Sequence, residues 1–114
     1  DQLPDINLGT FDEQSCDPDL SQTLQAVCAA QSRFTHVING RFKGGHITRG
    51  YGDPANHIHA VQLELSQRAY MNEPSDEQPI FAYREDRATE VRPLLSGLLE
   101  AMQRWGEVSY NKGK

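Results

Sequence analysis

One acidic and three basic side chains stand close together in the middle of this 114-residue sequence. Arg41, Lys43 and Arg49 lie in a glycine-rich stretch, Asn39–Asp53, and Glu64 follows in an apolar stretch. Arginine binds a carboxylate through two parallel hydrogen bonds, which lysine cannot do, so the two arginines are the stronger candidates for holding an anionic substrate. A buried carboxylate is uncommon unless it is paired, binds a metal or takes part in chemistry. We therefore interpret Glu64 as a candidate general base.

Each of these candidates also has an ordinary structural explanation. Glu64 would face solvent if its strand lay in a half-exposed sheet, and basic residues on a glycine-rich loop are often simply solvated. Arg68 follows four residues after Glu64, and it suits a structural ion pair as well as it suits substrate contact. The residue types alone leave these alternatives open.

The histidines do not complete a metal site. His57 and His59 are predicted to share one face of a strand, which is a geometry that supports two zinc ligands. That face is the apolar one, opposite to the face that carries Glu64. His46 stands at no diagnostic spacing from them, so we expect no metal site within this chain.

Nucleophilic and phosphate-binding sites are not indicated either. Cys16, Cys28 and Ser66 lack a recognisable nucleophile elbow or partner motif. The pair Gly44-Gly45 belongs to neither a GxGxxG nor a GxxxxGK[ST] pattern. Two cysteines without a CxxC motif favour buried thiols in a reducing compartment, and we expect a cytoplasmic location.

The elements that must position these residues can be predicted from turn signals and apolar spacing. Residues 6–8 suit a loop or a short edge strand. Asp17-Pro18 predicts the start of a helix that runs to about Gln31. Its apolar residues share one face, which we expect to be buried: Leu20, Leu24, Val27 and Cys28. Residues 34–38 and 47–48 favour short strands, and turns are predicted at Asn39-Gly40 and at residues 53–56.

Alternation predicts a longer strand over residues 58–66. Val61, Leu63 and Leu65 share one face, which we expect to pack against a helix. Glu64 shares the other face with Gln62, and we expect this face to border a cleft.

The last helix is predicted from an apolar stripe at helical spacing. The stripe consists of Val91, Leu94, Leu95, Leu98, Met102 and Trp105. Proline is tolerated only near the first turn of a helix, so we expect the helix to begin within a few residues of Pro93. Gly106 is the predicted end, and residues 107–114 are expected to fray.

Composition limits the class of protein. With 37% hydrophobic and 24% charged residues the chain is typical of a globular protein, and no apolar run is long enough to cross a bilayer. A net charge of −5 argues against general binding to nucleic acid. We expect residues 1–114 to form a single unit. Because the sequence opens at Asp1 within what looks like a loop, we expect this unit to be a piece of a longer protein.

Three stretches together resemble the C-terminal part of the N-formylglutamate amidohydrolases. They are Leu3-Pro-Asp-Ile-Asn-Leu-Gly-Thr10 with Ser15-Cys16, the glycine-rich stretch 39–52, and Gln62-Leu-Glu-Leu-Ser-Gln-Arg-Ala-Tyr-Met71. The resemblance implies an α/β fold, as the C-terminal portion of a zinc-carboxypeptidase-like sandwich with a mixed central sheet flanked by helices. It also implies zinc-dependent hydrolysis of N-formyl-L-glutamate, a linear amide, to formate and L-glutamate during histidine degradation.

The resemblance implies roles for individual residues. Glu64 matches the glutamate that takes a proton from the attacking water, and Arg41 and Arg49 would contact substrate carboxylates. Arg68 and Tyr70 would either contact the substrate or support the residues that contact it. The zinc ligands of the family precede the Leu-Pro-Asp motif with which this sequence opens, so the missing N-terminal part of the same protein would supply them. The alternative is a non-catalytic anion-binding or assembly module, which pairs with the missing part or forms a homo-oligomer.

Overall fold

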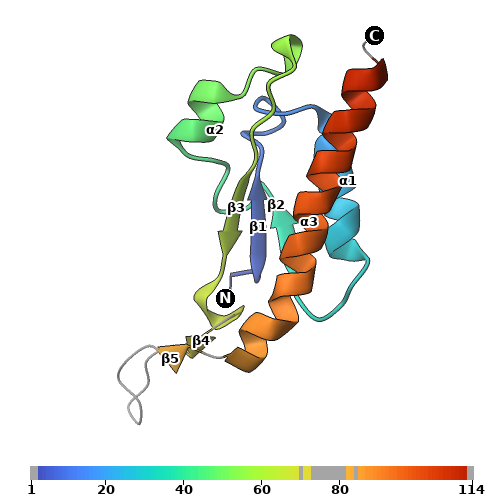
Figure 1. Cartoon of the computed structure of the whole chain (residues 1–114). Helices are drawn as coiled ribbons and strands as arrows, with labels where there is room; N and C mark the ends of the chain where they lie inside the picture. Colours follow the sequence, from blue (N-terminus) through green and yellow to red (C-terminus); the bar gives the residue numbers. More distant parts are fainter. Residues whose placement is uncertain (1–2, 70, 73–81, 84, 113–114) are drawn as a thin grey trace.

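A mixed three-stranded sheet forms the centre of the computed structural model (Figure 1). The structure describes residues 3–69, 71–72, 82–83 and 85–112. β1 (Ile6–Gly9) lies between β2 (His36–Ile38), to which it is parallel, and β3 (Gln62–Leu65), to which it is antiparallel. The predicted α/β class with a mixed sheet flanked by helices is therefore confirmed. The larger zinc-carboxypeptidase-like sandwich stays a prediction.

Two helices cover one face of this sheet. α1 (Pro18–Ala29) and the long α3 (Glu85–Lys112) run side by side, while the short α2 (His46–Tyr51) lies away from them on the other side of the strands (Figure 1). The core lies between the sheet and the helix pair. Its buried members are Ile6, Leu8, Cys16, Leu20, Leu24, Cys28, Phe34, Ala69, Val91, Leu94 and Leu98.

The prediction of a loop or edge strand at residues 6–8 is wrong, because β1 is the central strand. All four of its residues are buried, and it pairs along both edges. Turn-forming residues flank the strand on both sides in the sequence. Its two partners come from distant parts of the chain, so local propensity could not show that the strand is enclosed.

The prediction for α1 is confirmed. The Asp17 side chain accepts a hydrogen bond from the Asp19 N–H at 2.8 Å, and Pro18 occupies the first turn, where its missing N–H costs nothing. The predicted apolar face is turned to the core, and within it Val27 is only partly buried. The helix ends at Ala29, close to the predicted end at Gln31.

The alternation of β3 is confirmed, but the strand is shorter than predicted. Val61 and Leu65 pack against the core, whereas Leu63 on the same face remains 43% exposed. β3 is an outer strand of the described sheet, and Leu63 is not among the side chains that pack against the core between the sheet and the helices. The expectation that Leu63 packs against a helix is therefore wrong.

The segment before β3 is a turn rather than a strand. Pro54–Asn56 forms a 3-10 turn, as the turn signal predicted, and His57 ends it with a left-handed φ of 63°. The prediction that His57 and His59 share a strand face is wrong for this reason. Because this turn lies between the glycine-rich loop and β3, the side chains before β3 do not alternate as they would in a strand.

The predicted strand at residues 47–48 is also wrong, because these residues belong to α2. Thr48 is buried, and its hydroxyl donates to the Gly45 carbonyl at 2.8 Å at the start of this helix. The strand propensity of two β-branched residues is small, and the hydrogen bonds of the helical turn outweigh it.

α3 is longer than predicted at both ends. It begins at Glu85, so Pro93 stands inside the helix, and it continues past Gly106 to Lys112. Pro93 and Thr89 are both exposed, so the carbonyl that proline leaves unpaired can bind water. A Cβ at position 106 would meet nothing within 4 Å, and the helix simply tolerates the glycine there. Fraying of residues 107–114 stays a prediction.

A second, two-stranded sheet completes the described structure. β4 (Met71–Asn72) pairs antiparallel with β5 (Ala82–Tyr83). The acidic, proline-containing segment between these strands falls outside the described residues. Among the helices that the structure describes, none is long and apolar enough to cross a membrane.

Candidate active site

The face of the sheet opposite α1 and α3 carries polar side chains from β1 and β3. In the β1–β3 ladder Asn7 pairs with Glu64, and Gly9 pairs with Gln62. Because successive side chains in a strand point to opposite faces, Asn7 and Glu64 point away from the core that Ile6 helps to form. The predicted position of Glu64 on the polar face is therefore confirmed.

The glycine-rich loop is fixed to the end of β1 by its first residue. The Asn39 N–H donates to the Leu8 carbonyl at 2.8 Å, and Asn39 adopts a left-handed φ of 51°, which asparagine tolerates well. Its side-chain oxygen accepts from the Thr10 N–H at 2.8 Å, and its side-chain nitrogen donates to the Thr10 hydroxyl at 2.7 Å. Asn39 thus begins the loop in a defined direction.

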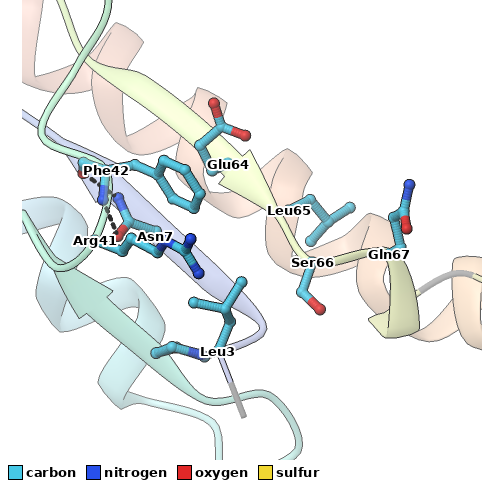
Figure 2. Close-up of a pocket in the computed structure, with 9 residues that line it drawn as sticks. Leu3, Asn7, Arg41, Phe42, Glu64, Leu65, Ser66 and Gln67 are labelled. Atoms are coloured by element: carbon cyan, nitrogen blue, oxygen red, sulfur yellow. Dashed lines mark hydrogen bonds between the residues drawn. The ribbon is translucent and has the colours of Figure 1, made fainter. Parts of the chain in front are cut away.

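Further contacts bring the loop back over the polar face. The Asn7 side-chain nitrogen donates to the Phe42 carbonyl at 2.6 Å, a contact drawn as a dashed line in Figure 2. The Phe11 N–H donates to the Lys43 carbonyl at 2.7 Å. A Cβ on Gly9 would lie 2.9 Å from the backbone nitrogen of Gly44, so this close approach requires glycine in β1.

A pocket of about 240 Å³ lies between the loop and the end of β3. Arg41 and Phe42 border it on the loop side, and Glu64 and the residues after it border it on the strand side (Figure 2). The other lining residues are Leu3, Pro4, Asn7, Leu65, Ser66 and Gln67. A cation and a carboxylate thus line one small pocket, and no ion pair joins Arg41 to Glu64 in the described part of the chain.

The structure brings together only part of the predicted site. Arg41 and Glu64 share the pocket, as the sequence suggested. Arg49 lies on α2 with its guanidinium 5.0 Å from the centre of the Phe11 ring, and it is not among the pocket-lining residues. The Arg68 side chain and Tyr70 lie outside the described residues. The roles predicted for Arg49, Arg68 and Tyr70 remain predictions.

The elements that form this site lie in a region that matches a known protein family. A family model described as N-formylglutamate amidohydrolase matches residues 1–71, which carry β1, the glycine-rich loop and β3. The chain belongs to this family. It is 56% identical over 111 residues to the N-formylglutamate deformylase of Pseudomonas putida, and 56% identical over 109 residues to that of Pseudomonas aeruginosa.

These matches cover most of this chain but less than half of each relative. They include 97% and 96% of the chain and 40% of the length of each deformylase. The crystal structure of an N-formylglutamate amidohydrolase from Ralstonia eutropha superposes with a TM-score of 0.69 at 24% identity. The superposition covers 98% of this chain and 36% of the Ralstonia eutropha chain. The chain therefore shares the fold of part of an N-formylglutamate amidohydrolase.

Several residues that build the site were not predicted from the sequence as functional residues. Asn7 supports the loop, Phe42 lines the pocket, and Gln62 contacts Glu64. The alternation of polar and apolar residues in the Leu-Pro-Asp-Ile-Asn-Leu-Gly stretch could have placed Asn7 on the same face as Glu64. That signal depends on the pairing of β1 with β3, which no local pattern predicts.

The residues around Glu64 do not fit a zinc ion by themselves. Within residues 3–69 and the other described parts, no three histidine, cysteine or acidic side chains are placed so that they could hold a metal ion. The groups beside Glu64 are an amide from Gln62 and, across the pocket, the guanidinium of Arg41, and neither is a usual zinc ligand.

His59 has a structural partner on each side. Its Nδ1 accepts a hydrogen bond from the Asp17 N–H at 3.0 Å, and its ring meets Trp105 edge-on with the ring centroids 4.8 Å apart. The Trp105 Nε1–H donates to Asp19 at 2.8 Å. His59 therefore connects the start of α1 to α3.

Both cysteines are buried free thiols, which excludes them as exposed nucleophiles. Burial raises the pKa of Cys16 to about 11, with Glu13 and Asp17 adding to the effect, and burial also raises the pKa of Cys28. We expect neither thiol to react with a disulfide reagent such as DTNB at pH 8 until the protein is unfolded in urea. Rapid release of thionitrobenzoate from the native protein would contradict this expectation.

Proposed function

We propose that this chain forms part of an enzyme that hydrolyses N-formyl-L-glutamate to formate and L-glutamate. The observation that carries the proposal is the pocket that Arg41 and Glu64 line together. Its volume of about 240 Å³ is below the range of about 300–1,000 Å³ typical for drug-sized ligands, so it suits a small metabolite. The names of the relatives support the choice of N-formylglutamate as that metabolite.

Glu64 would act as the general base of this reaction. It would take a proton from a water molecule as the water oxygen adds to the formyl carbon. The same proton would then pass to the amide nitrogen as the carbon–nitrogen bond breaks. The products are formate and L-glutamate, whose amino group is then free.

Arg41 would hold the substrate. It is exposed on the loop, and its guanidinium lies 5.9 Å from the Phe42 ring centre. A guanidinium offers two parallel N–H groups to a carboxylate, and N-formylglutamate carries two carboxylates. We propose Arg49, Arg68 and Tyr70 as further substrate-side groups.

The remaining parts of the proposal concern the rest of the protein. Since the chain spans about 40% of the length of its relatives, we propose that the remainder of the same protein completes a larger zinc-carboxypeptidase-like sandwich. That remainder would hold a zinc ion, whose chemistry is to polarise the formyl carbonyl. The enzyme would work in the cytoplasm, in histidine degradation.

Formate release tests this proposal. The full-length protein supplied with zinc should release formate from N-formyl-L-glutamate, while residues 1–114 alone should release none. No formate from the full-length protein would overturn the assigned activity. Formate from residues 1–114 alone would instead overturn the claim that the rest of the protein is needed.

An assembly surface is the second candidate function. Ile58 and Leu63 are 52% and 43% exposed, and β3 forms an edge of the described sheet. Exposed strand edges and apolar side chains favour association with another chain or another part of the same chain. Residues 1–114 that sediment as a stable monomer would count against this candidate.

Loss of Arg41 should weaken substrate binding more than turnover. Arg41→Ala is expected to raise KM about 10- to 100-fold, because a hydrogen bond to a charged group contributes about 1.5–3 kcal/mol. Arg104→Ala is the matched control, since Arg104 is exposed on α3 and, in the described part of the chain, forms a surface ion pair with Glu100 at 3.7 Å. Steady-state kinetics with N-formyl-L-glutamate measure both variants. An unchanged KM for Arg41→Ala would remove Arg41 from the site.

A further inference from the structure

The Gln62 side chain connects the glycine-rich loop to the candidate base. Its Oε1 accepts a hydrogen bond from the Gly45 N–H. Its Nε2 donates to the Glu64 Oε1 at 2.5 Å. A carbonyl oxygen and an amino group sit at the two ends of one rigid amide, so one residue makes both contacts at once.

The Gly45 contact decides which end of the amide faces Glu64. A backbone N–H can only donate, so it must meet the carbonyl end of Gln62. The amino end is then left to face the carboxylate, and a donor beside an ionised carboxylate forms one of the stronger hydrogen bonds in proteins. Reversing the amide would place two donors together at Gly45 and two acceptors together at Glu64.

The orientation of Glu64 depends on this bond. Gln62 and Glu64 lie on the same face of β3 and both are half-buried. Binding one carboxylate oxygen leaves the other free to take a proton. In the described part of the chain Gln62 is the side chain that donates to the carboxylate of Glu64.

We propose that Gln62 is a positioning residue that holds Glu64 in the orientation required of the base and ties the Arg41 loop to β3. The inference rests on the proposed function, because it assumes that Glu64 is the base. Its second half, the attachment of the loop, stands on geometry alone. The loop between Asn39 and Gly45 is held at its start by Thr10 and at its end by Gln62.

Two substitutions at this position separate the two contacts. Gln62→Glu keeps an oxygen that accepts from the Gly45 N–H but places a second carboxylate against Glu64. Gln62→Met has a similar length and removes both contacts. Gln103→Met, at an exposed position on α3, is the matched control for the second change.

In the full-length protein, the two Gln62 variants should differ in their effects on kcat and KM. Gln62→Glu is expected to lower kcat about 10- to 100-fold with KM for N-formyl-L-glutamate nearly unchanged, because misplacement of a catalytic group by about 1 Å costs about 10²-fold. Gln62→Met is expected to lower kcat similarly and also to raise KM, since the loop that carries Arg41 loses its attachment at Gly45 and keeps those at Asn39, Phe42 and Lys43. Gln103→Met should leave both constants unchanged. A normal kcat in Gln62→Met, with the fold verified by circular dichroism, would overturn the positioning role.

Hydrogen exchange of the Gly45 amide supplies a readout that does not depend on catalysis. Exchange should quicken about 10-fold or more in Gln62→Met, because the amide loses its partner, and should stay near the native rate in Gln62→Glu. Equal exchange in the native protein and Gln62→Met would overturn the loop attachment. If the native protein releases no formate, the proposed function fails and the base-positioning half fails with it, while Gly45 exchange still decides the loop attachment.

Discussion

Replacing Glu64 by glutamine in the full-length protein is expected to lower kcat by about 10²- to 10⁴-fold, the usual contribution of a general base. Glutamine has nearly the same shape and keeps an oxygen that can accept from Gln62, but it cannot take a proton from water. KM for N-formyl-L-glutamate should change little, because the Arg41 loop is untouched. Steady-state measurement of formate release tests the prediction.

The matched control is Glu100→Gln. Glu100 is exposed on α3, and its contact with Arg104 is a surface ion pair at 3.7 Å, so its loss should leave the kinetic constants unchanged. The same chemical change is thus made inside and outside the pocket. A Glu64→Gln protein that keeps most of its turnover would remove Glu64 from the mechanism. The zinc content of the native and Glu64→Gln proteins, measured alongside, would show whether the substitution affects the proposed metal.

Replacing Leu98 by alanine is expected to lower the free energy of unfolding by about 2–5 kcal/mol. Leu98 is 4% exposed and belongs to the core between the sheet and the helix pair. Truncation there removes buried apolar area and leaves a cavity. Urea unfolding of the full-length protein, followed by circular dichroism, measures the change.

The neighbouring leucine supplies the control on the same helix. Leu99 is 68% exposed, and Leu99→Ala should change the free energy of unfolding by less than about 0.5 kcal/mol. Helix propensity is altered equally in the two variants, so their difference reports the packing of α3 alone. Equal losses would show that α3 does not dock through the face that carries Leu98, or that another part of the protein covers Leu99.

The two long helices show how far sequence patterns reach. The Asp17-Pro18 start signal and the apolar spacing after it located α1 closely, and the stripe from Val91 to Trp105 located the buried face of α3. Both signals are local, since a helix makes its hydrogen bonds within itself. The ends of α3 were mispredicted because Pro93 and Gly106 stand at exposed positions, where the helix tolerates their local cost.

The candidate site divides along the same line. Alternation alone placed Glu64 and Gln62 on the polar face of β3, and the chemistry of arginine and glycine marked the loop around Arg41. Only the tertiary structure showed that this loop folds back over β1, held by Asn7 and by Gln62. It also separated Arg49 from the pocket.

The sequence by itself determined α1, the buried face of α3, the face of Glu64 and the family, because these depend on residues that are near neighbours or on motifs in continuous stretches. The tertiary structure alone decided that β1 is the central strand and that the Arg41 loop and Glu64 line one pocket. Strand pairing and loop closure join residues far apart in the chain. Their free energy comes from contacts that form only when the sheet is assembled, so no local pattern records them.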